Sequence, residues 1–218
     1  MPVIVSIVGK SGSGKTTLIE KLIPELGSRG YEVVTIKHTP EDVSLDEPGK
    51  DSWRHMQAGS QAVIIASATR MLLVRPLAPE AKLEEIVSVL GEDYDIVLAE
   101  GFKQDSAPKI EVHRREVGAP LEGVAGIIAI ATDEALDTPV RQFSLGDVAG
   151  MAEFLEEGLL KPYQDRVSLY VNRSPVSLSV FPRDLIGRVL VAMASSLRGV
   201  GEVRNLKFFF GRGRSGRH

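Results

Sequence analysis

The stretch from Val3 to Thr17, VIVSIVGKSGSGKTT, constrains the fold of this chain more than any other segment. An apolar run, a glycine-rich turn and the start of a helix follow one another there, and the turn satisfies the pattern G-x-x-x-x-G-K-[ST] without substitution. A loop of this kind points backbone N–H groups at a phosphate chain, which lies at the positive end of the following helix. The pattern therefore predicts a nucleotide-binding Walker A loop, also called a P-loop.

The motif gives each of its residues an expected role. Lys15 is expected to reach the terminal phosphates, and the hydroxyl of Thr16 to ligate Mg²⁺. The competing interpretation is a glycine-rich connection that matches by chance, and the strand and helix signals on either side disfavour it. The other residues expected to surround the phosphates are Gly9, Ser11, Gly12, Ser13, Gly14 and Thr17.

The segments after the loop set the fold class. Apolar residues recur at helical spacing from Thr17 to Leu26, and YEVVTIK, from Tyr31 to Lys37, is typical of a strand. A strand, a helix and a strand in this order form a βαβ unit. We therefore predict an α/β fold, a mostly parallel sheet of the P-loop NTPase type with flanking helices. Further strands are expected at residues 62–66, 71–74, 96–100, 109–113 and 124–131, and helices near 51–58, 81–90 and 146–158.

A domain boundary is predicted at Lys161-Pro162, where this pattern ends. Residues 1–162 contain 16 Lys and Arg against 26 Asp and Glu, whereas residues 163–218 contain 10 against 3. The second region is predicted to be a small basic α+β (ββαβ) domain with a frayed tail. Its expected elements are a hairpin of strands at 167–171 and 176–180, a helix at 182–197 and a strand at 202–210.

The composition limits the cellular compartments and the classes of partner that are compatible with this sequence. The chain has no cysteine, and its first residues run straight into a strand without a basic leader. No apolar run approaches the roughly 18 residues of a membrane-spanning helix. We expect a cytoplasmic protein that does not enter a membrane. Nucleic acid is disfavoured as a partner, because the C-terminal arginines are spread over hairpin, helix and tail; contact with the acidic domain of the same or a second subunit is favoured.

A second motif, DIVLAEG from Asp95 to Gly101, is an apolar strand that ends in an acid and a glycine. In phosphate-loop folds an acid at this place holds the water shell of Mg²⁺ or orients a water toward the γ-phosphate. Glu100 is therefore the expected metal-associated and catalytic acid beside Lys15. A merely solvated acid at a strand end is the alternative, and the intact phosphate loop disfavours it.

Weaker candidates follow the second predicted strand. The ends of parallel strands gather where ligands bind, so basic residues there can meet an anionic substrate. Asp46, in the polar loop 39–49, is a further candidate for the metal or for positioning a nucleophile, and His38 taken alone is equally typical of a surface histidine. The four candidates for binding an anion are Lys37, His38, Lys50 and Arg54.

Several stretches together resemble one known family, the molybdopterin-guanine dinucleotide biosynthesis protein B (MobB) family of GTP-binding proteins. The similar segments are GKSGSGKTTLIEKLI, IKH, DEPGKDSWRHMQAGS, and DIVLAEGFK followed by PKIEV, which cover most of residues 3–113. The resemblance implies GTP and Mg²⁺ as cofactors and a homodimer. It also implies a supporting role in attaching GMP to molybdopterin, with a molybdopterin guanylyltransferase as partner.

Carried over by position, the resemblance places the phosphate loop on residues 9–16, the Mg²⁺-associated acid on Glu100 and the acidic-loop aspartate on Asp46. Asp133 matches the place from which an aspartate reads guanine in GTP-binding relatives. Members often carry a histidine-rich run after the Lys-His pair, whereas this chain has TPED at residues 39–42. A role that depends on those histidines is therefore not implied for this chain.

Three functions are compatible with these observations. The first is a weak GTPase that assists molybdenum cofactor biosynthesis. The second is a P-loop kinase of a small metabolite, for which only the segments around Arg70 and Arg75 or Arg114 and Arg115 offer the arginine of a lid. The third is a non-catalytic adaptor that binds nucleotide to set its affinity for a partner enzyme.

Overall fold

The computed structural model describes residues 2–39, 48–78, 81–91, 93–163, 167, 169–171, 174–176, 178–201, 203 and 206. The chain divides into two compact units, residues 1–162 and 163–218. Within the described ranges, no helix is both long and apolar enough to cross a membrane.

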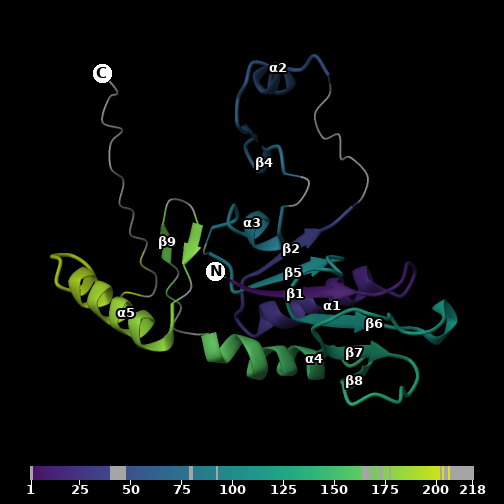
Figure 1. Ribbon diagram of the computed structural model, residues 1–218. Coiled ribbons are helices and arrows are strands. Elements are labelled where there is room, and N and C mark those ends of the chain that lie inside the picture. The colour runs from purple at the N-terminus through teal and green to yellow at the C-terminus, as the bar shows by residue number, and fades with distance from the viewer. Residues whose placement is uncertain are drawn as a thin grey trace. The chain divides into compact units, whose positions relative to one another are not determined.

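The first unit is built on a six-stranded sheet in which every pairing is parallel (Figure 1). Its strands lie in the order β2-β5-β1-β6-β7-β8. This sheet confirms the predicted α/β fold class. In chain order the strands are β1 (Val3–Val8), β2 (Val33–Lys37), β5 (Ile96–Glu100), β6 (Lys109–Val112), β7 (Ile127–Thr132) and β8 (Arg141–Ser144).

The strand order places the glycine-rich loop at the middle of the sheet. From β1 the chain crosses to β2 on one side, returns through β5, and then passes to β6 on the other side of β1. Ligands of open parallel sheets bind at the carboxyl ends of the strands, at the point where the direction of winding reverses. The loop that follows β1 lies at this point.

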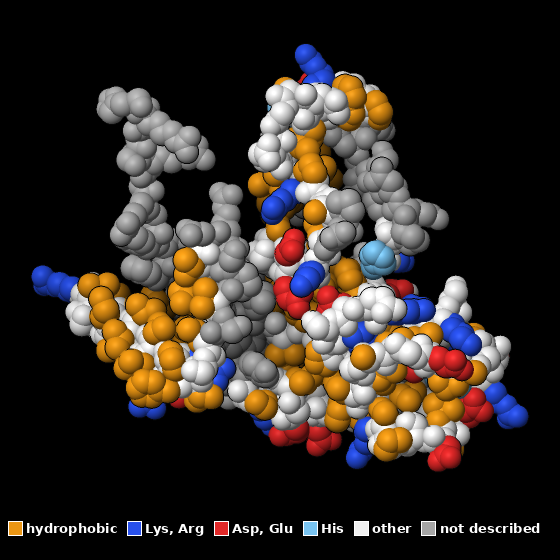
Figure 2. Space-filling model, in the orientation of Figure 1, with side chains coloured by type: hydrophobic (Ala, Val, Ile, Leu, Met, Phe, Trp, Pro, Cys, Tyr) orange, Lys and Arg blue, Asp and Glu red, His pale blue; other side chains and the backbone are white. Residues whose placement is uncertain are grey.

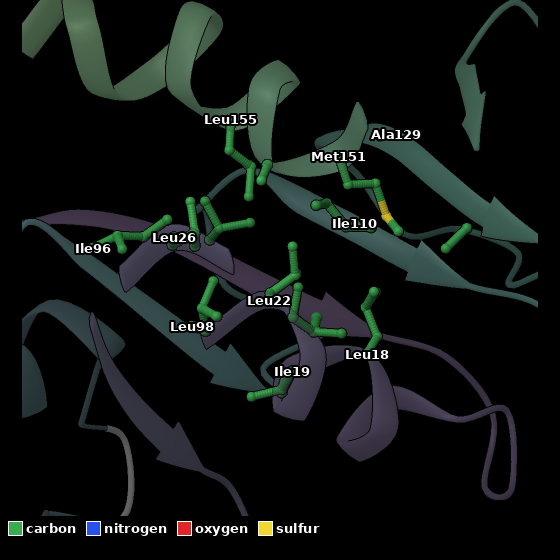
Figure 3. Close-up of a cluster of buried hydrophobic side chains, with 14 of the residues drawn as sticks. Leu18, Ile19, Leu22, Leu26, Ile96, Leu98, Ile110, Ala129, Met151 and Leu155 are labelled. Carbon is green, nitrogen blue, oxygen red and sulfur yellow. The ribbon is translucent and has the colours of Figure 1, made fainter. Parts of the chain in front are cut away.

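Helices bury both faces of the sheet. On one face α1 (Lys15–Ser28) and α4 (Val148–Leu155) pack together over the strands, and Figure 3 shows side chains of both helices in one cluster with Ile96 and Leu98 of β5. On the other face α3 (Leu83–Val87) covers the alternate side chains of β5. Both faces of β5 are therefore dry, which explains its continuous apolar sequence. This unit also contains the turns η1 (Arg115–Val117) and η2 (Glu156–Leu160), a wide helical turn that prolongs α4. The short turn η3 (Lys161–Tyr163) spans the boundary between the two units.

Two predicted strands form a separate antiparallel hairpin instead of joining the main sheet. These are β3 (Val63–Ala66) and β4 (Met71–Val74), and helix α2 (Asp51–Gln57) precedes them. Figure 2 shows hydrophobic side chains exposed in the region that Figure 1 labels β4. Ile64 is 60% and Met71 72% exposed, so this hairpin carries an apolar surface.

The edge strand β8 is absent from the predicted elements. Its sequence, RQFS, is short and contains a single buried apolar residue, Phe143. Hydrogen bonds of a polar side chain also hold this strand in place. The Gln142 side chain donates to the backbone oxygen of Leu136 at 2.7 Å and accepts from its backbone N–H at 2.9 Å. A side-chain contact of this kind has no signal in hydrophobic spacing.

The second unit contains a hairpin of β9 (Leu169–Val171) and β10 (Ser174–Val176), followed by helix α5 (Val180–Ser195). The predicted second strand at 176–180 is wrong, because the strand ends at Val176 and Val180 already begins the helix. Pro182 lies in the first helical turn, where its missing N–H has no helical partner to lose. The predicted strand at 202–210 lies almost wholly outside the described residues.

Candidate nucleotide-binding site

The loop between β1 and α1 can only be built with glycine at its tight positions. Gly9, Gly12 and Gly14 have φ angles of +154°, +77° and +97°, a region that other residues rarely enter. A Cβ on Gly9 would lie 2.5 Å from both the Ser13 hydroxyl oxygen and the backbone oxygen of Val112. The loop therefore closes against the end of β6, with room only for a bare backbone.

Lys15 lies across the loop that precedes it. Its Nζ donates to the backbone oxygens of Lys10, at 2.8 Å, and Gly9, at 3.3 Å. Partial burial lowers the pKa of Lys15, Glu100 opposes this shift, and the ammonium groups of Lys103 and Lys37 add to it. The lysine thus lies in a region where positive charge is concentrated, as a site for an anion requires.

Thr16 and Glu100 meet at the start of α1. The Thr16 hydroxyl lies 3.1 and 3.0 Å from the two carboxylate oxygens of Glu100, 84 residues away in the sequence. Glu100 is brought there because β5 pairs with β1 so that it lies opposite Ile7, just before the loop. The two residues expected to act on Mg²⁺ are therefore adjacent.

Ser13 gives an independent indication that the loop is built for a ligand. Its side chain is fully buried, and its hydroxyl has no hydrogen-bond partner among the described residues. A buried polar group without a partner is costly. The donors of the loop, the ammonium of Lys15 and the oxygens of Thr16 and Glu100 fit a phosphate chain with a divalent cation, for which oxygen ligands are preferred.

A pocket of about 140 Å³ lies on the side of α1 next to the loop. Arg114, which follows β6, forms one wall, and its Nε donates to the backbone oxygen of Ser13 at 3.1 Å. Sequence analysis missed this role and considered Arg114 only for a lid; its position after a predicted strand end was the available signal. The pocket is lined by Gly14, Thr17, Leu18, Lys21, Arg114, Leu145 and Gly146.

Asp133 follows β7 at the same edge of the sheet. Its Oδ1 accepts the backbone N–H of Arg115 at 2.9 Å, and the side chain is exposed. Next to it, His113, which is 2% exposed, lies 2.8 Å from Glu134 through Nε2 and Oε1. These contacts tie the segments after β6 and β7 together beside the loop.

The four weaker candidates fall into two places. Lys37 lies opposite Glu100 in the pairing of β2 with β5, and the backbone N–H of His38 donates to the backbone oxygen of Glu100 at 3.0 Å. Lys50 precedes α2 and Arg54 lies within it, on the segment that leads to the β3–β4 hairpin and not on the main sheet. Asp46 lies outside the described residues.

Comparison with known proteins gives the family. A family model described as Molybdopterin guanine dinucleotide synthesis protein B (MobB) matches residues 4–133. This chain belongs to the MobB family. The resemblance identified from the sequence is thereby confirmed, and the MobB match contains the loop, Glu100 and Asp133.

Individual MobB relatives cover different shares of the chain. A molybdopterin-guanine dinucleotide biosynthesis adapter protein of Haemophilus influenzae is 39% identical over 158 residues, 72% of this chain and 89% of that protein. A putative protein of the same description from Methanocaldococcus jannaschii is 24% identical in an alignment 230 positions long, which covers 94% of this chain and 95% of that protein. A crystal structure of molybdopterin-guanine biosynthesis protein B is 32% identical, with a TM-score of 0.58, and covers 72% of this chain and 100% of that chain.

Proposed function

We propose that this chain is a GTP-binding adapter with weak GTPase activity that assists the synthesis of molybdopterin guanine dinucleotide. The observation that carries this proposal is the Thr16–Glu100 contact at the glycine-rich loop, because it joins a metal-ligating hydroxyl to an acid beside the phosphate cradle. The adapter role is supported by family membership and by the description of the Haemophilus influenzae relative.

Different residues of the site would bind the phosphates of GTP, the Mg²⁺ ion and the nucleoside. Backbone N–H groups of residues 9–16 would surround the phosphates, and Lys15 would exchange its two carbonyl partners for terminal phosphate oxygens. Thr16 would ligate Mg²⁺, a cation that neutralises charge developing on the phosphates. Glu100 would hold a metal-bound water or orient the water that attacks the γ-phosphate. The pocket beside Arg114 is the expected place of the nucleoside.

Glu100→Gln is expected to lower the rate of GTP hydrolysis about 100-fold while the protein still binds GTP, since an amide can accept from Thr16 but cannot act as a base. Phosphate release from the purified protein, with and without a molybdopterin guanylyltransferase, measures the effect. Glu153→Gln, an exposed acid on α4, is the control and should hydrolyse GTP like the wild type. Unchanged hydrolysis in Glu100→Gln would remove this acid from the mechanism.

Asp133→Asn is expected to reduce the preference for GTP over ATP about tenfold, because an amide cannot accept both guanine N–H groups as a carboxylate does. The amide oxygen can still accept from Arg115, so the fold should be retained. Competition of GTP and ATP for a fluorescent nucleotide gives the ratio, with Asp137→Asn as the exposed control. A ratio that stays at the wild-type value would mean that guanine is read elsewhere.

A kinase would be distinguished by its product. Arg114 is anchored to the loop through Ser13, which leaves it poorly placed to act as the mobile arginine of a lid. Phosphate release without a phosphorylated acceptor would exclude the kinase, and nucleotide binding without release would favour the non-catalytic adaptor.

We further infer a cytoplasmic homodimer that acts with a molybdopterin guanylyltransferase. The apolar side chains exposed on the β3–β4 hairpin support self-association, since a patch of this kind is usually covered in solution. Sedimentation of the full chain at several concentrations measures its oligomeric state. The residues concerned are Ile64, Ile65, Met71 and Leu73.

A further inference from the structure

The carboxyl ends of β2 and β5 carry a group of side chains that the nucleotide site leaves unused. Lys37 ends β2 and His38 follows it, and Phe102 and Lys103 come soon after Glu100, which ends β5. The strand register brings the two ends together, because Lys37 lies opposite Glu100 and the N–H of His38 donates to the Glu100 backbone oxygen. We call these four residues the β2–β5 end group.

Positive charge exceeds negative charge at this place. Besides partial burial, Lys103 and Lys37 both lower the pKa of Lys15, so their ammonium groups lie near it. Glu100, which raises that pKa, is the acid among them. The side chains of Lys37 and Lys103 are exposed, and within the described ranges neither forms an ion pair. Figure 2 shows basic side chains next to an exposed histidine on the viewed face. One bound phosphate chain would engage Lys15, which leaves two cations for a second anion.

Two aromatic rings lie beside these cations in a strained turn. The rings of His38 and Phe102 are 5.0 Å apart, tilted by 51°. Phe102 has a φ of +55° and is the one non-glycine residue with positive φ in the described part of the chain. Strain of this kind persists where the surroundings fix it and is common at ligand sites. Here Phe102 packs against the apolar cluster under α3, which fixes the ring.

The tight turn that precedes Phe102 holds His38 in place as well. Gly101 has a φ of +101°, and a Cβ there would lie 3.2 Å from the Cβ of His38. The two strand ends therefore approach as closely as glycine allows. The His38 and Phe102 rings are therefore held together, with the exposed side chains of Lys37 and Lys103 next to them in the sequence.

We propose that the β2–β5 end group is a second ligand subsite, for a flat heteroaromatic ring that carries a phosphate monoester, specifically a pterin phosphate. The phosphate would bind Lys37 and Lys103, and the ring would stack on the Phe102 and His38 pair. The choice of a pterin rests on the proposed function. The presence of a second anion subsite rests on the strand register, the ring contact and the two exposed lysines. In this arrangement the phosphorylated pterin lies next to the terminal phosphates of the nucleotide.

The test uses the intrinsic fluorescence of neopterin monophosphate, titrated with the full-length protein while GDP and Mg²⁺ fill the phosphate loop. Neopterin without phosphate is the matched ligand control. Lys37→Ala and Lys103→Ala are each expected to weaken binding about tenfold, the loss of one charge-assisted contact. Phe102→Leu keeps the apolar packing and should also weaken binding. Arg141→Ala removes an exposed charge at the amino end of β8; it is the control variant and should bind neopterin monophosphate like the wild type.

The readouts separate this proposal from the function proposed above. Binding of a fluorescent GDP derivative reports on the phosphate loop, and neopterin monophosphate reports on the subsite. If the protein binds GDP but no neopterin monophosphate, the subsite is refuted and the GTP site stands. If GDP displaces the pterin competitively, or neopterin binds equally well, the subsite is also refuted. Pterin phosphate binding without any GDP binding would refute the GTP site alone.

Discussion

Lys15→Ala is expected to lower the affinity for GTP at least about 100-fold, which corresponds to about 2.8 kcal/mol. The ammonium is the charged donor nearest the expected terminal phosphates, and contacts between a charged donor and phosphate are among the strongest hydrogen bonds in proteins. Titration with a fluorescent GTP analogue in the presence of Mg²⁺ measures the loss. Lys82→Ala, which removes an exposed lysine beside α3, is the matched control and should bind GTP normally.

The same substitution should leave the fold intact, because Lys15 donates only to the backbone oxygens of Gly9 and Lys10 within its own loop. Thermal unfolding checks this. In the wild type, GTP affinity should fall as the pH rises through the pKa of Lys15, which partial burial sets below the ordinary 10.5. The sign follows because only the protonated amine attracts phosphate. Wild-type affinity in Lys15→Ala would contradict both the nucleotide site and the adapter that depends on it.

Gly9→Ala is expected to abolish GTP binding and to lower the free energy of unfolding by about 3 kcal/mol. The new Cβ would lie 2.5 Å from the backbone oxygen of Val112, and backbone cannot rotate away as a side chain can. The φ of +154° adds strain, because only glycine adopts it readily. Denaturant unfolding and nucleotide titration on the same preparation measure the two effects.

Gly27→Ala is the control for this substitution. Gly27 lies in α1, and nothing lies within 4 Å of the Cβ that alanine would add. Alanine favours helix over glycine by up to about 1 kcal/mol, so this variant should be as stable as the wild type or slightly more so. If the two substitutions had equal effects, the close approach of the loop to β6 would not be what constrains Gly9.

The fold could be predicted where local sequence and tertiary packing agree. The strand IVLAE was predictable because helices cover both of its faces, so its positions are apolar up to the terminal acid. The strand RQFS was not, since it is short, has a single buried apolar residue, and is held by the contacts of the Gln142 side chain with the Leu136 backbone. The second strand of the hairpin in the second unit was predicted too late in the chain, because Val180 suits a strand by propensity but begins a helix that Pro182 helps to start.

The residues of the candidate site likewise fall into those that the sequence predicted and those that it did not. Lys15, Thr16 and the glycines were recognisable because the loop is one continuous motif, and Glu100 because it ends a strand that pairs with β1. Arg114 was considered only for a lid, although it follows a predicted strand end, and Phe102 had no signal in the sequence pattern. The first acts through a backbone oxygen 101 residues away, and the second through a backbone angle that no side-chain pattern records.

The two hydrogen bonds of Lys15 to its own loop have a consequence for the kinetics of the site. Because the ammonium already bridges Gly9 and Lys10, the loop is held in shape before any nucleotide arrives. Binding then exchanges one set of acceptors for another and requires little ordering of the chain, so its entropic cost is low. Nucleotide binding should therefore need no slow rearrangement of the loop, so the association rate should not be limited by a change in loop conformation.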